Sequence, residues 1–510
     1  MNPIKSFKGR LDGLRNDFSS HYWEYIQYYC DSTIWDQSVL FESFGGKNFQ
    51  GNPYYLYREI FSSEAFSGLT LYIAHRNPEG CIRFLEARGL LDERVRVILY
   101  GSAEYRNVLS HTKYLINNVS FSMDWIKKSG QVYLNTWHGT PLKCLGRNIR
   151  NDPFELNNSQ RNMLLADLLL APNDLTARVF LEDHMIRDIM PGRLVYGGYP
   201  RNTAFFDREL RETIRRRFGL NEKQVVFYMP TWRGTAGGVK SMDFTTEMER
   251  LAEELGDEYA VFLKLHPAML QSVGKMRFCH QMPDEYEVYE FLNAADILIT
   301  DYSSVYFDFT NTGRRTILYQ YDRDSYFSDR GVYPDVLKLT PYPVVRTYAE
   351  LKQRILEGKE TADAAFREEF CPKDSPLAAR ELIAELKKFR PAQPGKPVDL
   401  YVISFPVTDE QLLRWKQLLV GQCFRFVFVP RRNNRRFSNL GCFDRIEYLT
   451  CWDTARSIGA ESLFAREKLI LRERKRLWGD LRIGHVYAKS GRLPLPLQMN
   501  LEPWPAELYY

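Results

Sequence analysis

The stretch DILITDYSSVYFDFTNTG, residues 296–313, contains one complete strand–turn–helix unit. Its apolar run at 297–299 is short and continuous, which is typical of a strand buried on both faces in a parallel sheet. Ser303 or Ser304 then caps a short helix, and Gly313 closes that helix. Units of this kind recur along the chain, so the sequence predicts an α/β fold with doubly wound parallel sheets.

Two series of apolar strands alternate with amphipathic segments that end in glycine, such as 208–219 and 245–256. The first series is SVLFES (38–43), LTLYIA (69–74), VRVILY (95–100), KYLIN (113–117), QVYLN (131–135), DLLLAP (167–172) and RLVYGG (193–198). The second series is QVVFYMP (224–230), YAVFLKLH (259–266), DILIT (296–300) and TILYQY (316–321). The series divide near GGYPRN (197–202), which predicts two Rossmann-type domains, residues 38–200 and 201–389, with a cleft between them.

The two ends of the chain differ from this pattern. Residues 1–37 are rich in aromatic and basic side chains, and we expect them to be helical and interfacial. The segment RPAQPGKP, 390–397, is typical of a linker. Residues 398–510 are expected to form a small α/β appendage of unknown role, with strands at 399–406, 424–430 and 445–450. A basic helix through 465–478 is interpreted as a solvated face, and an anchor on an anionic surface is the alternative.

The composition excludes several classes of protein. The 510 residues carry a net charge of +5, which is too weak to indicate nucleic acid binding but permits attraction to anionic substrates or membranes. The eight cysteines are scattered without a CxxC pair, as in proteins of a reducing cytoplasm. Neither a signal peptide nor an apolar run long enough to span a membrane is found, so we expect any membrane contact to be peripheral.

Polar and aromatic side chains follow four of the predicted strands at their carboxyl ends, where α/β folds bind ligands. These residues are Trp137, His138 and Gly139; Thr231, Trp232 and Arg233; Lys264 and His266; and Ser303 and Ser304. Thr140 followed by Pro141 predicts a helix start beside His138. Simpler interpretations remain for single motifs: the serines only cap a helix, and Arg233 is a surface residue. The other histidines are treated as structural or surface residues: His21, His75, His111, His184, His280 and His485.

Taken together and in this order, the motifs WHGTPLKCLG (137–146), YMPTWRG (228–234), KLHP (264–267) and TDYSSVYFDF (300–309) resemble the CDP-glycerol glycerophosphotransferase family of teichoic acid polymerases and primases. The segments 39–57 and 198–202 also resemble it, and the likeness covers roughly residues 38–370. The resemblance implies a GT-B-like pair of Rossmann domains that binds a CDP-linked polyol mainly through the second. The implied reaction transfers polyol phosphate to an acceptor hydroxyl and releases CMP.

The resemblance also implies roles for individual residues. His138 is the expected general base, because a neutral imidazole suits proton transfer from a hydroxyl near pH 7. His266 and Lys264 are expected to contact the pyrophosphate, and Ser303 and Ser304 to hold phosphate oxygens. The remaining residues expected to bind substrate are Trp137, Gly139, Thr140, Pro141, Lys143, Arg201, Thr231, Trp232, Arg233 and Asp308. We expect no cofactor and no metal, and the DxD-like Asp322–Asp324 is not interpreted as a metal site.

The substrates are constrained only in part. The implied donor is CDP-glycerol or CDP-ribitol, and the acceptor is a polyol phosphate or a glycan- or lipid-linked hydroxyl, used in the cytoplasm at the inner face of the membrane. Thr203 stands where the family has an acid, and PYPVV (341–345) replaces its usual Pro-Gly-Pro, so the polyol and the acceptor stay open. Teichoic acid and capsule synthesis both fit. The rival hypotheses are a GT-B nucleotide-sugar glycosyltransferase and a non-catalytic scaffold for envelope assembly.

Overall fold

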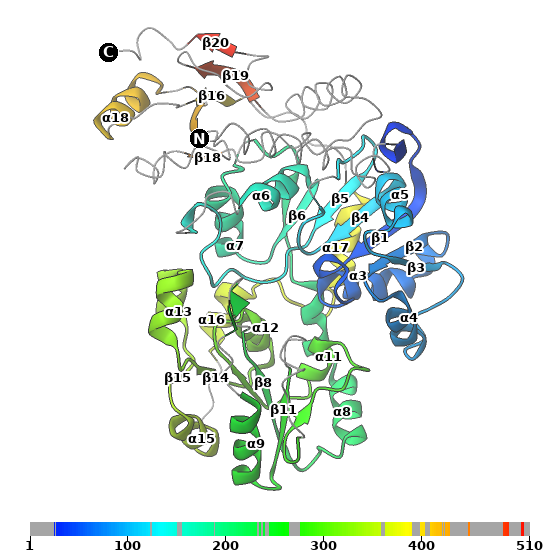
Figure 1. Cartoon of the computed structure of the whole chain (residues 1–510), viewed down its shortest axis with the longest axis vertical. Helices are drawn as coiled ribbons and strands as arrows, with labels where there is room; N and C mark the ends of the chain where they lie inside the picture. Colours follow the sequence, from blue (N-terminus) through cyan, green and yellow to red (C-terminus); the bar gives the residue numbers. More distant parts are fainter. Residues whose placement is uncertain are drawn as a thin grey trace, which may run out of the picture.

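The computed structural model describes most of residues 25–389 and short pieces of the chain beyond them. The described residues are 25, 27–122, 125–149, 156–187, 189–231, 234–235, 238–239, 244–264, 276–358, 363–389, 398–402, 409–420, 422, 424–428, 447–448, 483–488 and 501–503. Figure 1 shows two large sheets stacked along the long axis, with a smaller sheet beyond the first.

The first lobe is built on a seven-stranded parallel sheet with the order β3-β2-β1-β4-β5-β6-β7. Its strands are β1 (Trp35–Glu42), β2 (Thr70–His75), β3 (Val95–Leu99), β4 (Thr112–Asn117), β5 (Val132–Asn135), β6 (Leu168–Ala171) and β7 (Arg193–Tyr196). Its helices include α3 (Asn52–Phe61), α4 (Pro78–Glu86), α5 (Ala103–His111), α6 (Leu156–Leu165) and α7 (Asp174–Arg178). The strand order reverses between β1 and β4, which is the doubly wound arrangement.

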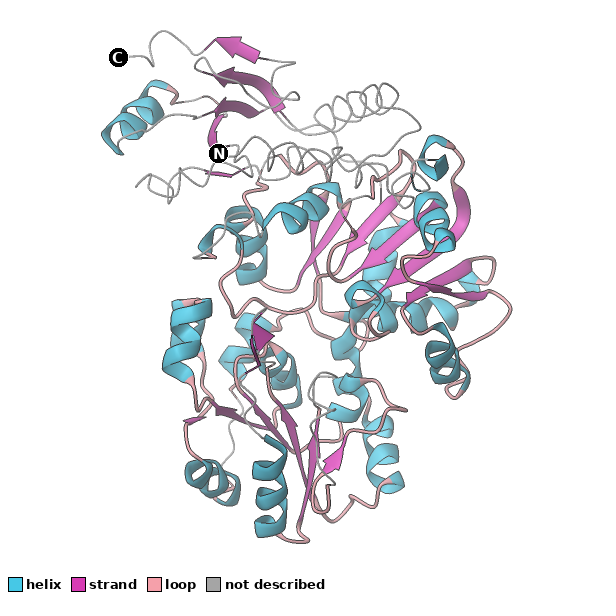
Figure 2. Cartoon of the chain, viewed as in Figure 1, coloured by secondary structure: helices cyan, strands magenta, loops and turns pink. Residues whose placement is uncertain are grey.

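The second lobe repeats this topology in a six-stranded parallel sheet with the order β12-β11-β8-β13-β14-β15. Its strands are β8 (Gln224–Met229), β11 (Tyr259–Leu263), β12 (His280–Gln281), β13 (Ile297–Thr300), β14 (Arg315–Tyr319) and β15 (Val344–Val345). Its helices include α8 (Arg208–Arg217), α9 (Phe244–Leu255), α11 (Val288–Leu292), α12 (Val305–Phe309), α13 (Arg323–Arg330), α14 (Pro334–Leu339), α15 (Tyr348–Leu356) and α16 (Ala364–Phe370). Figure 2 shows helices flanking both large sheets, so the predicted α/β class is confirmed.

Several connections hold the two lobes together, among them the ion pairs of Arg58 and Arg88 with Glu290 of α11. The 3₁₀ helix η6 (Pro200–Phe206) joins them along the chain, and α17 (Ala378–Lys387) returns from the second lobe to pack on α3. The segments 142–145 and 331–333 pair across the lobes, since the Tyr333 amide donates to the Leu142 carbonyl at 3.1 Å and the Cys144 amide to the Gly331 carbonyl at 3.3 Å. One hydrophobic cluster runs from Phe41 in β1 to Phe307 in α12.

The helix predicted to start at Thr140–Pro141 is wrong. The chain from 140 to 145 runs without helical structure, and Lys143 forms an isolated bridge with Val332 of the second lobe. Thr and Pro are favourable at a helix start, but here the backbone groups of 142–145 are satisfied by the other lobe instead. The tertiary pairing therefore overrides the local preference.

Beyond the linker, a third parallel sheet has the order β18-β17-β16-β19-β20. Its strands are β16 (Val398–Val402), β17 (Phe424–Phe428), β18 (Glu447–Tyr448), β19 (Ile483–Ala488) and β20 (Leu501–Pro503), with helix α18 (Asp409–Leu418). The α/β character expected of the appendage is thus present. The linker 390–397 and the basic helix 465–478 lie outside the described residues, and the domain limits stay a prediction.

The N-terminal segment is helical where it is described, at residues 25 and 27–30. Tyr25 is buried, and its hydroxyl donates to the Ile126 carbonyl at 2.8 Å, so this part of the segment packs into the first lobe. None of the helices in the described parts of the chain has both the length and the apolar character needed to cross a bilayer.

Candidate active site

The turn Trp137–Gly139 directly follows β5 and is held in a strained backbone conformation. Trp137 has a φ of +52° and Gly139 a φ of +149°, values that L-residues with side chains rarely adopt. Such strain costs on the order of 1–3 kcal/mol and persists only where the surroundings fix it. Asn52, at the start of α3, donates from Nδ2 to the Trp137 carbonyl at 3.1 Å, and Arg201 Nη1 donates to the His138 carbonyl at 2.7 Å.

The His138 ring is oriented by the backbone that follows β4. Its Nδ1 lies 2.9 Å from the Asn118 carbonyl, which can only accept a hydrogen bond, so Nδ1 carries the proton and Nε2 presents its lone pair. The ring lies 4.5 Å from that of Trp137 and 6.1 Å from that of Phe44, centroid to centroid.

Three influences set the protonation state of His138. Burial lowers its pKa to about 4, and the hydrogen bond to Asn118 opposes this shift. The positive charges of Arg201 and Lys143 lower the pKa further. The imidazole is therefore neutral at pH 7, which is the form that a general base requires.

Arg201 and Asp308 form a buried ion pair between the lobes, with an Nη2 to Oδ2 distance of 2.6 Å and side chains only 3% and 1% exposed. Asp308 also accepts from the Tyr289 hydroxyl at 2.7 Å and from Asn202 Nδ2 at 3.0 Å. Burial disfavours the guanidinium charge, but Asp308, with Tyr289 and Tyr199, raises the Arg201 pKa above its ordinary value. Arg201 thus ties the His138 turn to helix α12, and its predicted contact with the donor stays a prediction, as does that of Asp308.

Gly139 lies against Ser304, which brings the carboxyl ends of β5 and β13 together across the lobes. A Cβ placed on Gly139 would lie 2.4 Å from Ser304 Oγ and 3.2 Å from Arg201 Nη2, so no side chain fits there. Ser304 makes no capping hydrogen bond to α12, and the Ser303 Oγ lies 3.5 Å from the Val305 amide. Capping alone therefore does not account for the two hydroxyls.

Of the predicted site residues on β8 and β11, the structure describes Thr231 and Lys264. Thr231 follows β8, and its hydroxyl donates to Asp301 at 2.6 Å. Lys264 follows β11, where burial lowers its pKa and the carboxylates of Asp284 and Glu287 oppose that shift. Trp232, Arg233 and His266 lie outside the described residues, so the predicted approach of His266 to His138 stays a prediction.

Two residues after the turn have partners on different lobes, Thr140 on the first and Lys143 on the second. The Thr140 hydroxyl accepts from Asn173 Nδ2 at 3.0 Å, and Lys143 Nζ lies 5.7 Å from the centroid of the Tyr326 ring. Both are near His138 in the chain but have protein partners of their own. Pro141 continues the extended segment towards Leu142.

Sequence reasoning missed five residues that support the turn through amide, phenol, carboxylate or backbone carbonyl groups. They are Asn52, Asn118, Asn202, Tyr289 and Asp374. Asn118 meets the criterion that singled out the other candidates, because it follows β4 at the carboxyl end of the sheet. Asp374 is far away in sequence, and its hydrogen bond from Asn202 Nδ2, at 2.7 Å, arises only from the fold.

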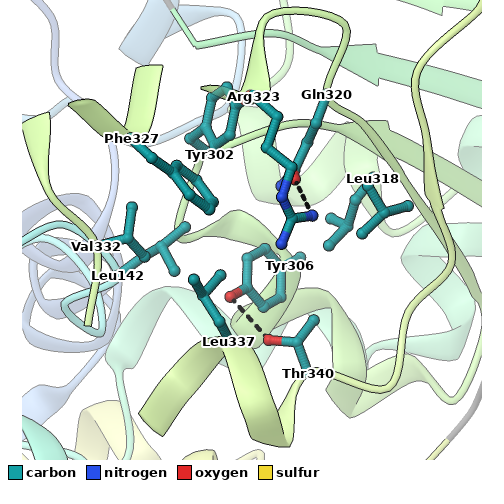
Figure 3. Close-up of a pocket in the computed structure, with 11 residues that line it drawn as sticks. Leu142, Tyr302, Tyr306, Leu318, Gln320, Arg323, Phe327, Val332, Leu337 and Thr340 are labelled. Atoms are coloured by element: carbon teal, nitrogen blue, oxygen red, sulfur yellow. Dashed lines mark hydrogen bonds between the residues drawn. The ribbon is translucent and has the colours of Figure 1, made fainter. Parts of the chain in front are cut away.

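A small cavity lies between Leu142 of the first lobe and Tyr302, Arg323 and Phe327 of the second (Figure 3). Its volume is about 40 Å³, enough for water molecules but too little for a nucleotide. The adjacent Asp322 accepts from the Tyr302 hydroxyl at 3.1 Å. Asp324, by contrast, pairs with Arg346 at 3.4 Å, so the two carboxylates have separate partners. No cluster of potential metal ligands is present among the described residues.

Comparison with known proteins agrees with this geometry. A family model described as CDP-glycerol:poly(glycerophosphate) glycerophosphotransferase matches residues 25–385. The chain belongs to this family. The resemblance predicted from the four motifs is thereby confirmed, and with it the class of the protein as a transferase.

Two relatives show how the lengths compare. The chain is 27% identical over 376 residues to the teichoic acid poly(glycerol phosphate) polymerase of Staphylococcus epidermidis, covering 69% of this chain and 50% of that protein. It is 28% identical over 381 residues to the polymerase of the same name from Bacillus spizizenii, covering 69% of this chain and 92% of that protein. The chain thus spans half of the first relative and almost all of the second.

Solved structures of the wall teichoic acid polymerase TagF match the fold with a TM-score of 0.62 and 25% identity, covering 76% of this chain and 98% of that one. One of them is a histidine variant with CDPG. This match, together with the two doubly wound sheets, confirms the predicted GT-B-like pair of Rossmann-type domains.

The contact between Gly139 and Ser304 can be tested by substitution. Gly139→Ala is expected to lower the free energy of unfolding by about 1–3 kcal/mol, because the new methyl group meets Ser304 Oγ and the backbone becomes strained. Adding Ser304→Ala should recover part of this loss, measured by urea denaturation. Gly89→Ala is the control, since Gly89 also has a positive φ but no atom within 4 Å of the added Cβ. A double variant no more stable than Gly139→Ala would contradict the contact.

Proposed function

We propose that this protein transfers glycerol phosphate from CDP-glycerol to an acceptor hydroxyl and releases CMP, in the synthesis of a teichoic acid or capsule-type polymer. The observation that carries the proposal is the placement of His138. A neutral imidazole with Nε2 available lies on the first lobe, and the next residue contacts Ser304 of the second lobe. An acceptor held by one lobe and a donor held by the other would meet at this point.

The proposed chemistry is one in-line displacement at phosphorus. The acceptor oxygen attacks the phosphorus that bears glycerol, a new P–O bond forms, and the P–O bond to CMP breaks. The acceptor proton passes to His138 Nε2, and CMP leaves with the electron pair of the broken bond. Such transfers depend mainly on positioning and electrostatic stabilisation.

Lys264 and the hydroxyls of Ser303 and Ser304 are proposed to bind the diphosphate. Each follows a strand of the second lobe at the same edge of its sheet. A cation and hydroxyl donors suit the charge that develops on the leaving phosphate. His266, Trp232, Arg233 and Thr231 complete the proposed donor site, and Arg201 and Asp308 fix the turn that carries the base.

CDP-ribitol is the second candidate donor, because the chain departs from the family pattern at Thr203 and at 341–345. We propose an acceptor that ends in a polyol phosphate or in a glycan- or lipid-linked hydroxyl. The reaction is assigned to the cytoplasm, at the inner face of the membrane. The net charge of +5 supports a peripheral contact with anionic lipid there.

A donor screen tests the proposed function. CDP-glycerol, CDP-ribitol and UDP-sugars are offered with a polyol-phosphate acceptor, and nucleotide release and product mass are measured. We expect CMP from CDP-glycerol, and His138→Ala should lower kcat by about 10²- to 10⁴-fold, the usual contribution of a general base. His111→Ala is the control, because His111 lies directly before β4, at the opposite end of the sheet from Asn118 and His138. Release of UDP instead, or unchanged turnover by His138→Ala, would contradict the proposal.

The low pKa of His138 predicts the pH dependence of the reaction. A base must be deprotonated, so activity is lost only as the pH falls through its pKa, here about 4. At pH 5.5 such a base is about 97% neutral, whereas one of ordinary pKa 6.5 is about 9% neutral. We expect kcat/KM for CDP-glycerol at pH 5.5 to stay close to its value at pH 7.5, with circular dichroism to verify folding. A tenfold fall between these values would contradict the argument from burial.

A further inference from the structure

Asn118 orients His138 through its backbone carbonyl, and one nitrogen of its own side chain has no hydrogen-bond partner in the described part of the chain. The residue follows β4 at the point where the strand order of the first sheet reverses, and it is completely buried. Its carbonyl orients His138, and its Oδ1 accepts from the Phe44 amide at 2.9 Å. Its Nδ2 is buried without a hydrogen-bond partner in the described part of the chain. A buried amide donor without an acceptor is costly and rare in proteins.

The loop that donates a hydrogen bond to this side chain follows β1 and is unusual in its backbone. Phe44, Gly45 and Gly46 all have positive φ values, +48°, +64° and +70°. For phenylalanine this conformation is strained, and such strain gathers at functional sites. A Cβ on Gly51 would lie 3.6 Å both from Asn118 Nδ2 and from Phe44 Cε2, so the amide and the ring flank the same glycine. The Phe44 ring is partly exposed and lies edge-on to His138.

A positive charge, from Arg76 directly after β2, packs against the same loop. Arg76 is exposed, and its Nε donates to the Gly45 carbonyl at 3.0 Å while its amide donates to the Gly46 carbonyl at 2.7 Å. The loop next to the base thus has the Arg76 guanidinium packed against its backbone, and it contacts the Asn118 side chain, whose Nδ2 has no partner in the described part of the chain. Both groups suit an anionic oxygen, and neither is used by the donor site described above.

We propose that Asn118 Nδ2 and Arg76 form a subsite for the phosphodiester of the acceptor, and that the Phe44 ring covers it until the acceptor displaces the ring. This inference rests on the proposed function, and it adds the chemical group of the acceptor that the first lobe recognises. In this proposal Asn118 has two roles. Its backbone carbonyl orients His138, and its side chain binds the acceptor. The acceptor hydroxyl would then be positioned by the same residue that positions His138.

Two synthetic acceptors test the subsite. Both end in glycerol, one joined to an octyl chain through a phosphodiester and the other through an ether. In Asn118→Asp the Oδ1 still accepts from Phe44, but the donor is replaced by a negative oxygen. We expect KM for the phosphodiester acceptor to rise at least tenfold, with KM for the ether acceptor and for CDP-glycerol changed less than twofold. Asn221→Asp, on the exposed surface of the second lobe, adds the same charge as a control.

A second variant covers the case in which Asn118→Asp folds poorly. Phe44→Ala keeps the backbone bond to Asn118 and removes the ring, so KM for the phosphodiester acceptor should fall severalfold. A merely structural role for either residue would shift the KM of both acceptors alike, or neither, and would overturn the proposal. Binding of CDP-glycerol without transfer to the phosphodiester acceptor would overturn the subsite alone. Absence of CDP-glycerol binding would instead overturn the proposed function.

Discussion

The buried ion pair between Arg201 and Asp308 is the interaction on which the site depends. Its guanidinium spans the two lobes, because one nitrogen holds the His138 carbonyl and another holds the carboxylate of α12. Removing one partner of a buried, fully hydrogen-bonded pair typically costs about 3–5 kcal/mol, since the other charge is left unpaired. The strained turn that carries His138, the proposed base, persists only where the surrounding structure fixes it, and this ion pair supplies such support.

The same arrangement links stability to chemistry. The turn is held on one side by Asn52 and on the other by Arg201, while Asn118 fixes the ring that the turn presents. None of these three contacts uses His138 Nε2, so this nitrogen stays available for the proposed role of a base. Burial lowers the pKa of His138 and so keeps its imidazole neutral, which is the form that the proposed proton transfer requires.

Much of the fold follows from the sequence because it depends on local patterns. Short apolar runs separated by amphipathic segments are enough to identify parallel strands, and the predicted strands of both lobes are found where expected. The helix at Thr140–Pro141 was predicted wrongly because its competitor, the segment 331–333, lies nearly 190 residues away and makes no local signal. The strands β12, β15 and β20, of two or three residues, escaped prediction because only their neighbours in the sheet define them, and the six-residue β19 was also not predicted.

Apart from the family resemblance, the sequence predicted site residues only where a residue type that suggests catalysis or binding stands directly after a predicted strand. His138 and Ser304 stand directly after strands, so the motif and the edge of the sheet both indicate them. The contact of Arg201 and Asp308 with the donor stays a prediction, and their pairing with each other is a relation that no spacing reveals. Asn118 lay at the correct edge but belongs to a residue type that does not suggest catalysis.

The most direct test of the account is a crystal structure of His138→Asn with CDP-glycerol. The account predicts a diphosphate between residue 138 and Ser304, with the phosphorus that bears glycerol on the side of the first lobe and its oxygens near Ser303, Ser304 and Lys264. A diphosphate bound at any other surface, with the turn and Ser304 apart, would contradict it.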